Sequence, residues 1–196
     1  MAKNKTKPEE FPASQEIRRE INRTEYYKRY RKIIKSTLFS LITVAAIGVL
    51  VATLLFPVFQ IYGTSMSPTL SDGEIAIGLK THNFETGDIV AFYLNNKILI
   101  KRVIAGPGDW VDIDPQGNVF VNKQPIDEPY VTERAFGDCD LDLPYQVPES
   151  RYFVMGDHRS VSLDSRNTVI GCIAEEQIVG TISFKIWPVA SFGPVQ

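Results

Sequence analysis

The chain has 196 residues, of which 44% are hydrophobic and 22% charged, and its formal net charge is -2. This length suits one sizeable folded domain with an additional segment. Charge is distributed unevenly: residues 1–35 contain 11 Lys/Arg and 5 Asp/Glu, whereas the chain from Asp72 onward contains 10 Lys/Arg and 18 Asp/Glu. Because the folded part is acidic, the composition argues against a nucleic-acid-binding protein, and we expect no nucleic-acid partner.

An apolar stretch separates the basic and acidic parts. Residues 36–56 are 21 residues without a charge, which as a helix would span roughly 30 Å, the thickness of a bilayer core. A buried core helix rarely stays apolar on every face. A cleaved signal peptide would have a shorter apolar region followed by small residues, whereas large side chains fill Leu54 to Phe59. We therefore predict a retained transmembrane helix.

The charge asymmetry predicts the topology and the domains. Lys and Arg concentrate on the cytoplasmic side of membrane spans, so we expect a single-pass cell-membrane protein with its N-terminus in the cytoplasm. The expected parts are a basic cytoplasmic segment over 1–35, a transmembrane helix over 36–57 and an extracytoplasmic domain over 58–196. Residues 1–15 are expected to be disordered, and residues 16–35 to continue the helix.

Beyond residue 57 the pattern changes to short strands and turns. Strands are predicted at 59–62, 74–80, 88–94, 97–105, 110–113, 118–122, 151–155 and 177–187. Asn95-Asn96 suits the positive φ of a tight hairpin, and residues 125–150 form an acidic, proline-rich loop. The predicted fold is mostly β: an antiparallel, closed or nearly closed β fold behind a single N-terminal transmembrane helix.

Ser65 lies in the turn-like stretch Gly63–Leu70, shortly after the apolar run. A serine in a turn is usually only a turn former, so a nucleophilic serine requires a base elsewhere in the chain. Of the histidines, His82 lies in a polar turn, while His158 near acidic residues would allow a Ser-His arrangement. No His, Cys and carboxylate spacing resembles a zinc site, so we expect no metal and no cofactor.

Lys101 is the second candidate base. Alternation along strand 97–105 places Lys101 on the same face as Leu99 and Val103. A lysine on an apolar face loses hydration of its ammonium form, so its pKa falls and a neutral amine becomes accessible as a general base. The alternative is a lysine that extends to solvent or pairs with a carboxylate.

A third polar stretch runs from Gly156 to Arg166. It combines the carboxylates of Asp157 and Asp164 with the guanidinium groups of Arg159 and Arg166, and serines lie between them. Carboxylate–guanidinium pairs would hold such a turn and present hydroxyls at fixed positions. A salt-bridged surface loop is the competing interpretation.

Four stretches together carry a family resemblance. They are Ser65-Met66-x-Pro68-Thr69-Leu70; Gly87-Asp88-Ile89-Val90; Lys101-Arg102-Val103 followed by Gly106-Pro107-Gly108-Asp109; and Gly156-Asp157-x-Arg159-x-x-Ser162-x-Asp164-Ser165-Arg166. Behind a single apolar span, they resemble the motifs of type I signal peptidases of the Gram-positive type. These are membrane-bound serine endopeptidases that remove signal peptides from exported preproteins. The match extends to about Trp187.

The resemblance implies a Ser/Lys dyad. Ser65 would attack the scissile carbonyl while neutral Lys101 accepts its proton, and an acyl-enzyme would form and be hydrolysed. By the same mapping, Ser162 would orient the Lys101 amine, and Asp164 with Arg166 would hold that region in shape.

The resemblance also implies how substrate binds. The Ser65 N–H would be one oxyanion donor, and Gly63 stands where some members carry a second donor, a serine hydroxyl. Small pockets would favour Ala-type residues one and three positions before the cut, and the implied partners are signal peptides and the lipid bilayer. The expected substrate-binding residues are Gln60, Ile61, Tyr62, Gly63, Met66, Leu99 and Ile100.

The sequence departs from the family pattern in the last stretch. His158 stands where the family usually carries Asn, and Asn167-Thr168-Val169 replaces an aromatic pair. The short interval before Gly156 excludes a large accessory β domain. The two cysteines, Cys139 and Cys172, are compatible with a disulfide or with a buried free thiol at Cys172.

Two further function classes fit the sequence. A related Ser/Lys peptidase would cleave itself or mature one dedicated partner, as the dyad also occurs in SOS-repressor-type proteases. Those proteases are soluble and usually carry a DNA-binding domain, and we expect no such domain here. A non-catalytic anchored β domain would instead bind extended peptides at a sheet edge without turnover.

Overall fold

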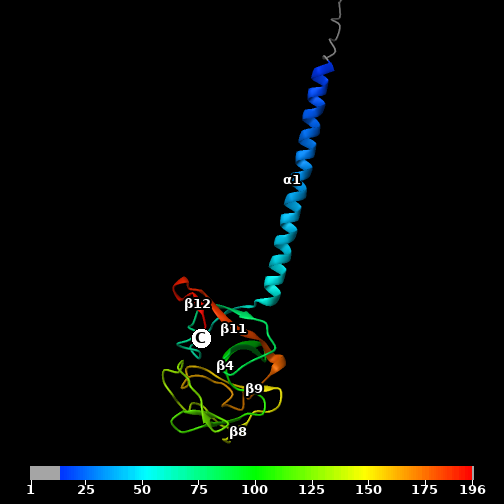
Figure 1. Cartoon of the computed structure of the whole chain (residues 1–196). Helices are drawn as coiled ribbons and strands as arrows, with labels where there is room; N and C mark the ends of the chain where they lie inside the picture. Colours follow the sequence, from blue (N-terminus) through cyan, green and yellow to red (C-terminus); the bar gives the residue numbers. More distant parts are fainter. Residues whose placement is uncertain (1–13, 196) are drawn as a thin grey trace, which may run out of the picture. The chain divides into compact units, whose positions relative to one another are not determined.

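The computed structural model of the chain describes residues 14–195, with side chains from residue 17 onward. The chain divides into two compact units, one ending at Ala52 and the other beginning at Thr53 (Figure 1). The disorder expected for residues 1–15 falls almost entirely outside the described residues. Ser14 and Gln15 are already helical, so the helix begins two residues before the predicted start.

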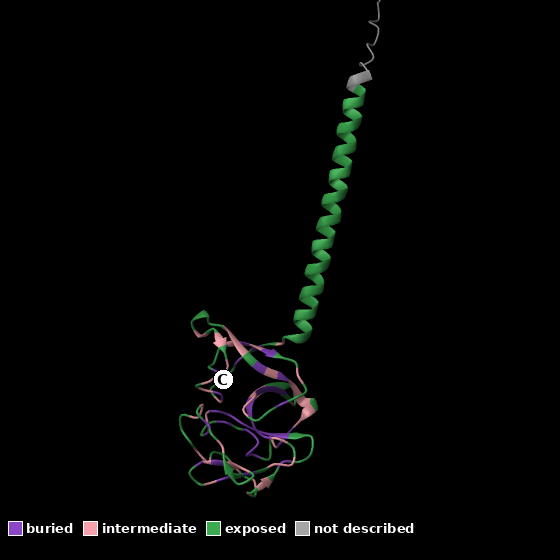
Figure 2. Ribbon diagram, in the orientation of Figure 1, coloured by how far each residue is buried: buried purple, intermediate pink, exposed green. Residues whose placement is uncertain are grey.

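A single long helix, α1 (Ser14–Leu55), forms the N-terminal part. It contains no proline, and it ends two residues before Pro57, because the residue preceding a proline disfavours helical backbone. Among the described residues it is the one helix long and apolar enough to cross a membrane. Its side chains are exposed along the whole described length, which is typical of a helix that needs an apolar environment rather than a protein core (Figure 2).

The larger of two sheets has eight strands, all paired antiparallel. Its order is β1-β2-β11-β3-β4-β9-β10. β12 also pairs with β11, and the two lie together in Figure 1. The strands are β1 (Val58–Gln60), β2 (Ile75–Leu79), β3 (Ile89–Leu94), β4 (Lys97–Ala105), β9 (Arg151–Met155), β10 (Ile173–Ala174), β11 (Ile178–Trp187) and β12 (Gly193–Pro194).

The smaller sheet has four strands in the order β7-β6-β5-β8. Its strands are β5 (Trp110–Ile113), β6 (Val119–Val121), β7 (Gln124–Pro125) and β8 (Tyr145–Gln146), and two short 3-10 helices, η1 (Glu175–Gln177) and η2 (Val189–Ser191), flank β11. The predicted mostly β, antiparallel fold is confirmed. The sheets stay open, which agrees with the nearly closed form of that prediction.

The predicted strands match the observed ones closely. β4 has the predicted bounds, and Asn95 in the β3–β4 hairpin takes a φ of 52°. The strands that the sequence did not predict, β7, β8, β10 and β12, have two residues each, too few to display an alternating pattern.

Three clusters of buried side chains form the core of the second unit. One of them includes Ile61, Met66 and Leu70, which are at most 3% exposed. These apolar residues lie on both sides of Ser65, so burying them fixes the segment that carries the serine.

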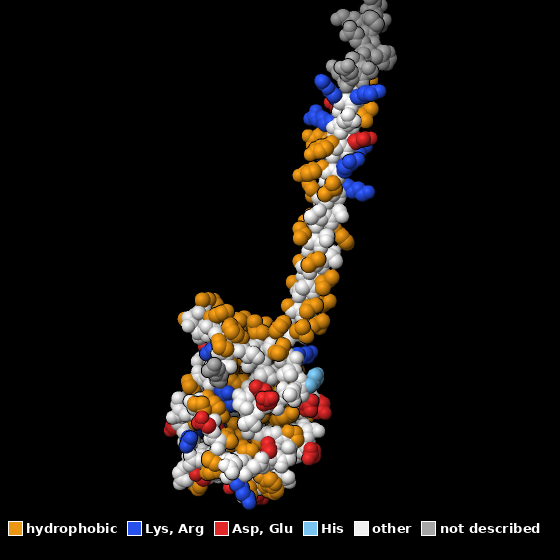
Figure 3. Space-filling model, in the orientation of Figure 1, with side chains coloured by type: hydrophobic (Ala, Val, Ile, Leu, Met, Phe, Trp, Pro, Cys, Tyr) orange, Lys and Arg blue, Asp and Glu red, His pale blue; other side chains and the backbone are white. Residues whose placement is uncertain are grey.

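Apolar side chains also gather on one outer edge of this unit, over β11 and β12 (Figure 3). Val58 of β1, Trp187 at the end of β11, and Val189 and Phe192 around η2 are all more than half exposed. We call these four residues the apolar edge. A contiguous exposed apolar surface is typical of a site that contacts a partner or a membrane.

A buried ion pair ties the segment before β8 to the segment after β9. Arg159 is fully buried, and its Nη1 lies 3.2 Å from Oε2 of Glu128, while its Nη2 pairs with Oε1. Glu128 belongs to the stretch predicted as a loop. The pair fixes this irregular stretch to the segment after β9.

Replacing Glu128 with alanine should strongly destabilise the second unit. The change leaves the Arg159 guanidinium buried without its partner, which typically costs about 3–5 kcal/mol. Urea unfolding of the detergent-solubilised chain can be followed by the fluorescence of Trp110 and Trp187, which both lie in this unit. The control is exposed Glu133→Ala, which should change the free energy of unfolding by less than about 0.5 kcal/mol. Equal unfolding midpoints for the two variants would contradict the assignment.

Candidate active site

Ser65 lies in a tight turn between β1 and β2. Gly63 takes a φ of +83°, a conformation that side chains rarely adopt, and its N–H donates to Oδ1 of Asp72 at 2.6 Å. The Ser67 N–H donates to the Thr64 carbonyl at 3.0 Å and closes the turn. The Ser65 side chain is half-buried, so its hydroxyl is accessible from one side.

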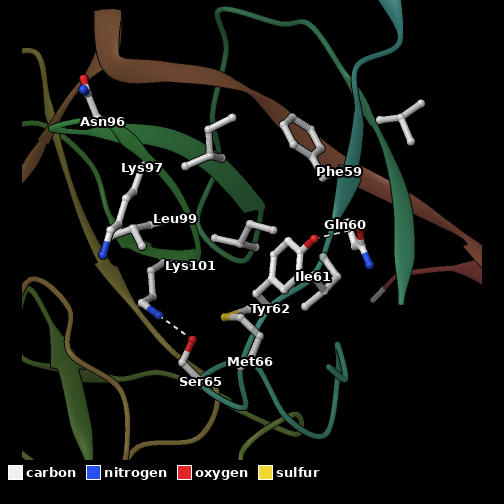
Figure 4. A pocket seen from close by; sticks show the side chains of 14 residues that line it. Phe59, Gln60, Ile61, Tyr62, Ser65, Met66, Asn96, Lys97, Leu99 and Lys101 are labelled. Atoms are coloured by element: carbon white, nitrogen blue, oxygen red, sulfur yellow. Dashed lines mark hydrogen bonds between the residues drawn. The ribbon is translucent and has the colours of Figure 1, made fainter. Parts of the chain in front are cut away.

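Lys101 of β4 faces this serine. Its Nζ donates to Oγ of Ser65 at 2.6 Å (Figure 4), and the residue is 4% exposed. Burial lowers the pKa of Lys101 to about 8, an effect that Asp164 and Asp157 oppose and Arg166 reinforces. The expected burial and the expected direction of the pKa shift are confirmed. Among the described residues no carboxylate forms an ion pair with Lys101, so the alternative of a paired lysine does not apply.

The Ser65 N–H is an available backbone donor beside the nucleophile. Within residues 14–195 the Ser65 N–H has no hydrogen-bond partner, whereas the Gly63 N–H is engaged by Asp72. An unpaired N–H beside a nucleophile can stabilise an oxyanion. Gly63 offers no second donor, because it has no side chain and its N–H is occupied.

The stretch after β9 contains Asp164 and Arg166, which form a buried ion pair. The Asp164 carboxylate accepts from the Gly156 N–H at 3.0 Å and from the Arg166 guanidinium at 2.8 and 2.9 Å. Arg166 also donates to the carbonyl groups of Phe136 at 2.8 Å and Arg159 at 2.9 Å. Asp164 and Arg166 are fully buried, which agrees with the expectation that they hold this region in shape.

Ser162 lies close to the nucleophile segment. A Cβ added to Gly156 would come within 2.2 Å of Oγ of Ser162 and 2.5 Å of the Ser65 carbonyl oxygen, so only glycine permits this approach. The Ser162 hydroxyl is buried and has no hydrogen-bond partner among the described residues. The expected hydrogen bond between Ser162 and Lys101 therefore stays a prediction.

Asp157 connects three of the four matching stretches. It accepts from the Arg102 guanidinium at 2.9 and 2.8 Å and from the Thr69 hydroxyl at 2.5 Å. Arg102 also stacks over the ring of Tyr130 at 3.8 Å. The sequence showed these residues within motifs, but it gave no signal for their pairing or for the roles of Glu128 and Tyr130, which come from the segment predicted as a loop.

Neither histidine takes the place of the lysine. The backbone N–H of His158 donates to the Ser65 carbonyl at 3.1 Å, and its Nδ1 lies 3.3 Å from the Thr64 carbonyl oxygen. His82 is exposed. Among the described residues Lys101 is the one basic side chain that contacts the Ser65 hydroxyl, so the Ser-His alternative has no geometric support.

Ser65 and Lys101 lie at one end of a groove of about 600 Å³ (Figure 4). All the expected substrate-binding residues line it: Gln60, Ile61, Tyr62, Gly63, Met66, Leu99 and Ile100. Five further residues that the sequence did not indicate also line the groove: Val58, Phe59, Asn96, Lys97 and Ile98. The Tyr62 hydroxyl donates to Oε1 of Gln60 at 2.8 Å, so these two side chains border the groove together.

Two strand edges border the groove. β1 has β2 on one side, and among the described residues no strand lies on its other side. In β4, Lys97 to Ile100 pair with β3 alone, since the pairing with β9 begins at Arg102. Unpaired strand edges present rows of N–H and C=O groups, and an extended peptide can bind to them.

The described residues contain no group of three His, Cys, Asp or Glu side chains that would hold a metal ion. Cys139 and Cys172 are both free. Burial raises the pKa of Cys172 to about 11, so this thiol stays protonated and unreactive at neutral pH.

Known proteins resemble this chain in sequence. The family described as "Signal peptidase, peptidase S26" matches residues 32–187. Signal peptidase IB of Staphylococcus aureus is 40% identical over 154 residues, covering 68% of this chain and 79% of that protein. Signal peptidase I of Bacillus licheniformis is 36% identical over 174 residues, covering 79% and 91%. A crystal structure of a signal peptidase I from Enterococcus faecalis aligns with a TM-score of 0.43 at 25% identity, over 50% of this chain and 96% of that one.

The family match covers most of the chain, and the relatives align over most of their own length. The chain therefore belongs to the signal peptidase family, peptidase S26. The resemblance seen in the sequence is confirmed, and the apolar helix α1 precedes the β unit as that resemblance implied.

Replacing Lys101 with methionine should stabilise the protein below pH 8. The folded-state pKa of about 8 lies below the ordinary 10.5, so protonating the buried amine costs folding energy at neutral pH. Each unit of pKa corresponds to about 1.4 kcal/mol, so we expect a gain of order 3 kcal/mol at pH 7. Because the unfolded chain binds more protons between pH 8 and 10.5, the gain should shrink across that window.

Urea unfolding at pH 7, 9 and 10.5 measures this dependence. Exposed Lys80→Met is the matched control and should show no comparable gain at any of the three pH values. A gain that does not change with pH would show that Lys101 is not held in a desolvating site.

Proposed function

We propose that this chain is a membrane-anchored serine endopeptidase that removes N-terminal signal peptides from exported preproteins. Ser65 is the nucleophile and neutral Lys101 the general base. The observation that carries the proposal is the 2.6 Å contact between Oγ of Ser65 and a buried Lys101 amine whose pKa is lowered to about 8. Membership of the signal peptidase family supports the choice of substrate.

Acylation begins with attack of Ser65 Oγ on the scissile carbonyl carbon. The hydroxyl proton passes to Nζ of Lys101, which becomes an ammonium, and the carbonyl oxygen becomes an oxyanion near the Ser65 N–H. When the C–N bond breaks, the ammonium returns its proton to the departing amine of the mature protein. The signal peptide is left as an ester on Ser65, and Lys101 is neutral again.

Deacylation uses the same two side chains. Lys101 accepts a proton from a water molecule while the water oxygen attacks the ester carbonyl. Collapse of the second tetrahedral intermediate breaks the ester bond, and the Lys101 ammonium returns its proton to Oγ of Ser65. The signal peptide leaves as a carboxylic acid, which loses its remaining proton to solvent as a carboxylate. Ser162 is proposed to orient the Lys101 amine during these transfers, because its buried hydroxyl has no other partner among the described residues.

The groove is proposed to hold the segment before the cleavage site. An extended chain would pair with the free edges at Gln60 to Tyr62 and at Leu99-Ile100, so the backbone supplies affinity with little dependence on sequence. Ile61 and Met66 are buried and line the groove, and small side chains are proposed to pack against them. This suits Ala-type residues one and three positions before the cut.

The proposed arrangement in the cell has three parts. Residues 1–35 form the basic cytoplasmic segment, 36–57 the transmembrane helix and 58–196 the extracytoplasmic catalytic domain. Lys and Arg before the span favour this orientation, and the span of α1 is apolar enough to cross a bilayer. The apolar edge of the second unit suits contact with the lipid surface.

Ser65→Ala and Lys101→Ala should each abolish cleavage of a signal-peptide substrate by the detergent-solubilised chain. In the wild type, kcat/KM should rise about tenfold per pH unit below pH 8 and level off above it, because only neutral Lys101 accepts the proton. Cleavage assays between pH 6 and 10 measure this profile.

Lys97→Ala is a matched control on the same strand, since its exposed amine lines the groove but does not contact Ser65. It should keep the pH profile of the wild type. Full activity in Ser65→Ala would overturn the dyad. Cleavage of one dedicated partner but of no general signal peptide would favour a specialised Ser/Lys peptidase instead.

The proposed topology predicts where cysteines are accessible in intact cells. After Cys139 and Cys172 are replaced by serine, Glu149→Cys in the second unit should react with a membrane-impermeant maleimide. Arg29→Cys in α1 should react only after the cells are permeabilised; both positions are exposed in the structure. Labelling of Arg29→Cys alone in intact cells would reverse the orientation.

A further inference from the structure

His158 contacts the two peptide groups on either side of the nucleophile. Its backbone N–H donates to the Ser65 carbonyl at 3.1 Å, which belongs to the peptide group after Ser65. Its ring Nδ1 lies 3.3 Å from the Thr64 carbonyl oxygen, which belongs to the peptide group before Ser65. A carbonyl oxygen only accepts hydrogen bonds, so Nδ1 carries the hydrogen in this contact.

The contact between the His158 ring and the Thr64 carbonyl affects the Ser65 N–H, which is the proposed oxyanion donor. The Thr64 carbonyl and the Ser65 N–H belong to one planar peptide group, in which the C=O and N–H bonds point in opposite directions. The Thr64 carbonyl also accepts from the Ser67 N–H at 3.0 Å. The hydrogen bond from the ring is a second contact to this oxygen and helps to fix the direction of the N–H. It also polarises the peptide group, which strengthens the N–H as a donor.

His158 is itself held in place. Its neighbours Asp157 and Arg159 are at most 1% exposed and are paired with Arg102 and Glu128. The His158 carbonyl accepts from the Ser162 N–H at 3.0 Å, which connects it to the other side of the site. The backbone that carries the ring is therefore held in place. A residue that positions a reacting group needs such support.

We propose that the His158 ring is a positioning residue that orients the Ser65 N–H toward the oxyanion. This inference rests on the proposed function, in which that N–H stabilises the oxyanion. Any residue other than proline at this position would make the backbone contact to Ser65. The contact to Thr64 needs a side-chain donor two bonds beyond Cβ, so it depends on the side chain.

Two neutral variants separate hydrogen bonding from packing. In His158→Asn the amide nitrogen stands as many bonds from Cα as Nδ1 does, so the donor is kept. In His158→Leu a side chain of similar size has no donor. The full-length protein in detergent is assayed for kcat, KM and thermal stability with a signal-peptide substrate, and for the pH dependence of kcat.

We expect His158→Leu to lower kcat about tenfold, because a misdirected oxyanion donor is weakened rather than removed. KM should stay within about twofold, since the groove is unchanged, and the apparent pKa of the kcat profile should not move, since Lys101 is untouched. His158→Asn should stay within about threefold of the wild-type kcat. The ring is only half-buried, so both variants should unfold within about 2 °C of the wild type.

A second reaction tests the same donor without a signal peptide. Acylation of Ser65 by p-nitrophenyl acetate also passes through an oxyanion, and peptide mass mapping locates the acetyl group. The acylation rate should fall in His158→Leu and be retained in His158→Asn. Ser65→Ala provides the background, because it cannot be acylated at this position.

The possible outcomes distinguish a failure of the proposed role of the His158 ring from a failure of the proposed function. A wild-type kcat in His158→Leu, equal losses in the Leu and Asn variants, or an effect confined to KM would each overturn the role of the ring. A loss that follows a lowered unfolding temperature would make His158 merely structural. A wild type that neither cleaves signal peptides nor is acylated at Ser65 would overturn the proposed function, and this inference with it.

Discussion

The desolvation of the Lys101 amine beside Ser65 is the constraint on which the site depends. Burial makes the ammonium form costly and lowers the pKa to about 8, so a neutral amine is accessible near physiological pH. Nearby Asp157 and Asp164 act in the opposite direction. Each carboxylate is paired with an arginine, whose positive charge opposes the effect of the carboxylate on the pKa of Lys101. A base with these properties suits proton transfer from a serine.

Buried ion pairs place the parts of the site relative to one another. Asp157 joins Thr69 and Arg102, while Asp164 holds the Gly156 N–H and Arg166. Such pairs add little net stability, because removing their charges from water offsets the attraction. Their effect is on position. The pairs fix where the segments that bear the serine, the lysine and the unpaired Ser162 hydroxyl lie relative to one another.

The two free strand edges that border the groove offer backbone groups to which a peptide can bind. Free strand edges favour uncontrolled pairing, yet β1 and the first half of β4 leave theirs open on both sides of the groove. Backbone pairing accepts many sequences, and the buried side chains of Ile61 and Met66 line the groove. In the proposed function, this combination lets one enzyme process diverse preproteins that share only small residues near the cut.

The sequence by itself determined the apolar helix, most strands and the family, because these appear as hydrophobic periodicity or as ordered motifs. It placed Lys101 on an apolar face but left open whether its amine extends to solvent or pairs with a carboxylate. Only the tertiary structure decided the contact between Ser65 and Lys101, which lie 36 residues apart. It also decided the burial of Glu128 in a stretch predicted as a loop, and the contact of His158 with Thr64. These features depend on where distant segments pack against each other, and hydrophobic period along one strand carries no information about its partners across the core.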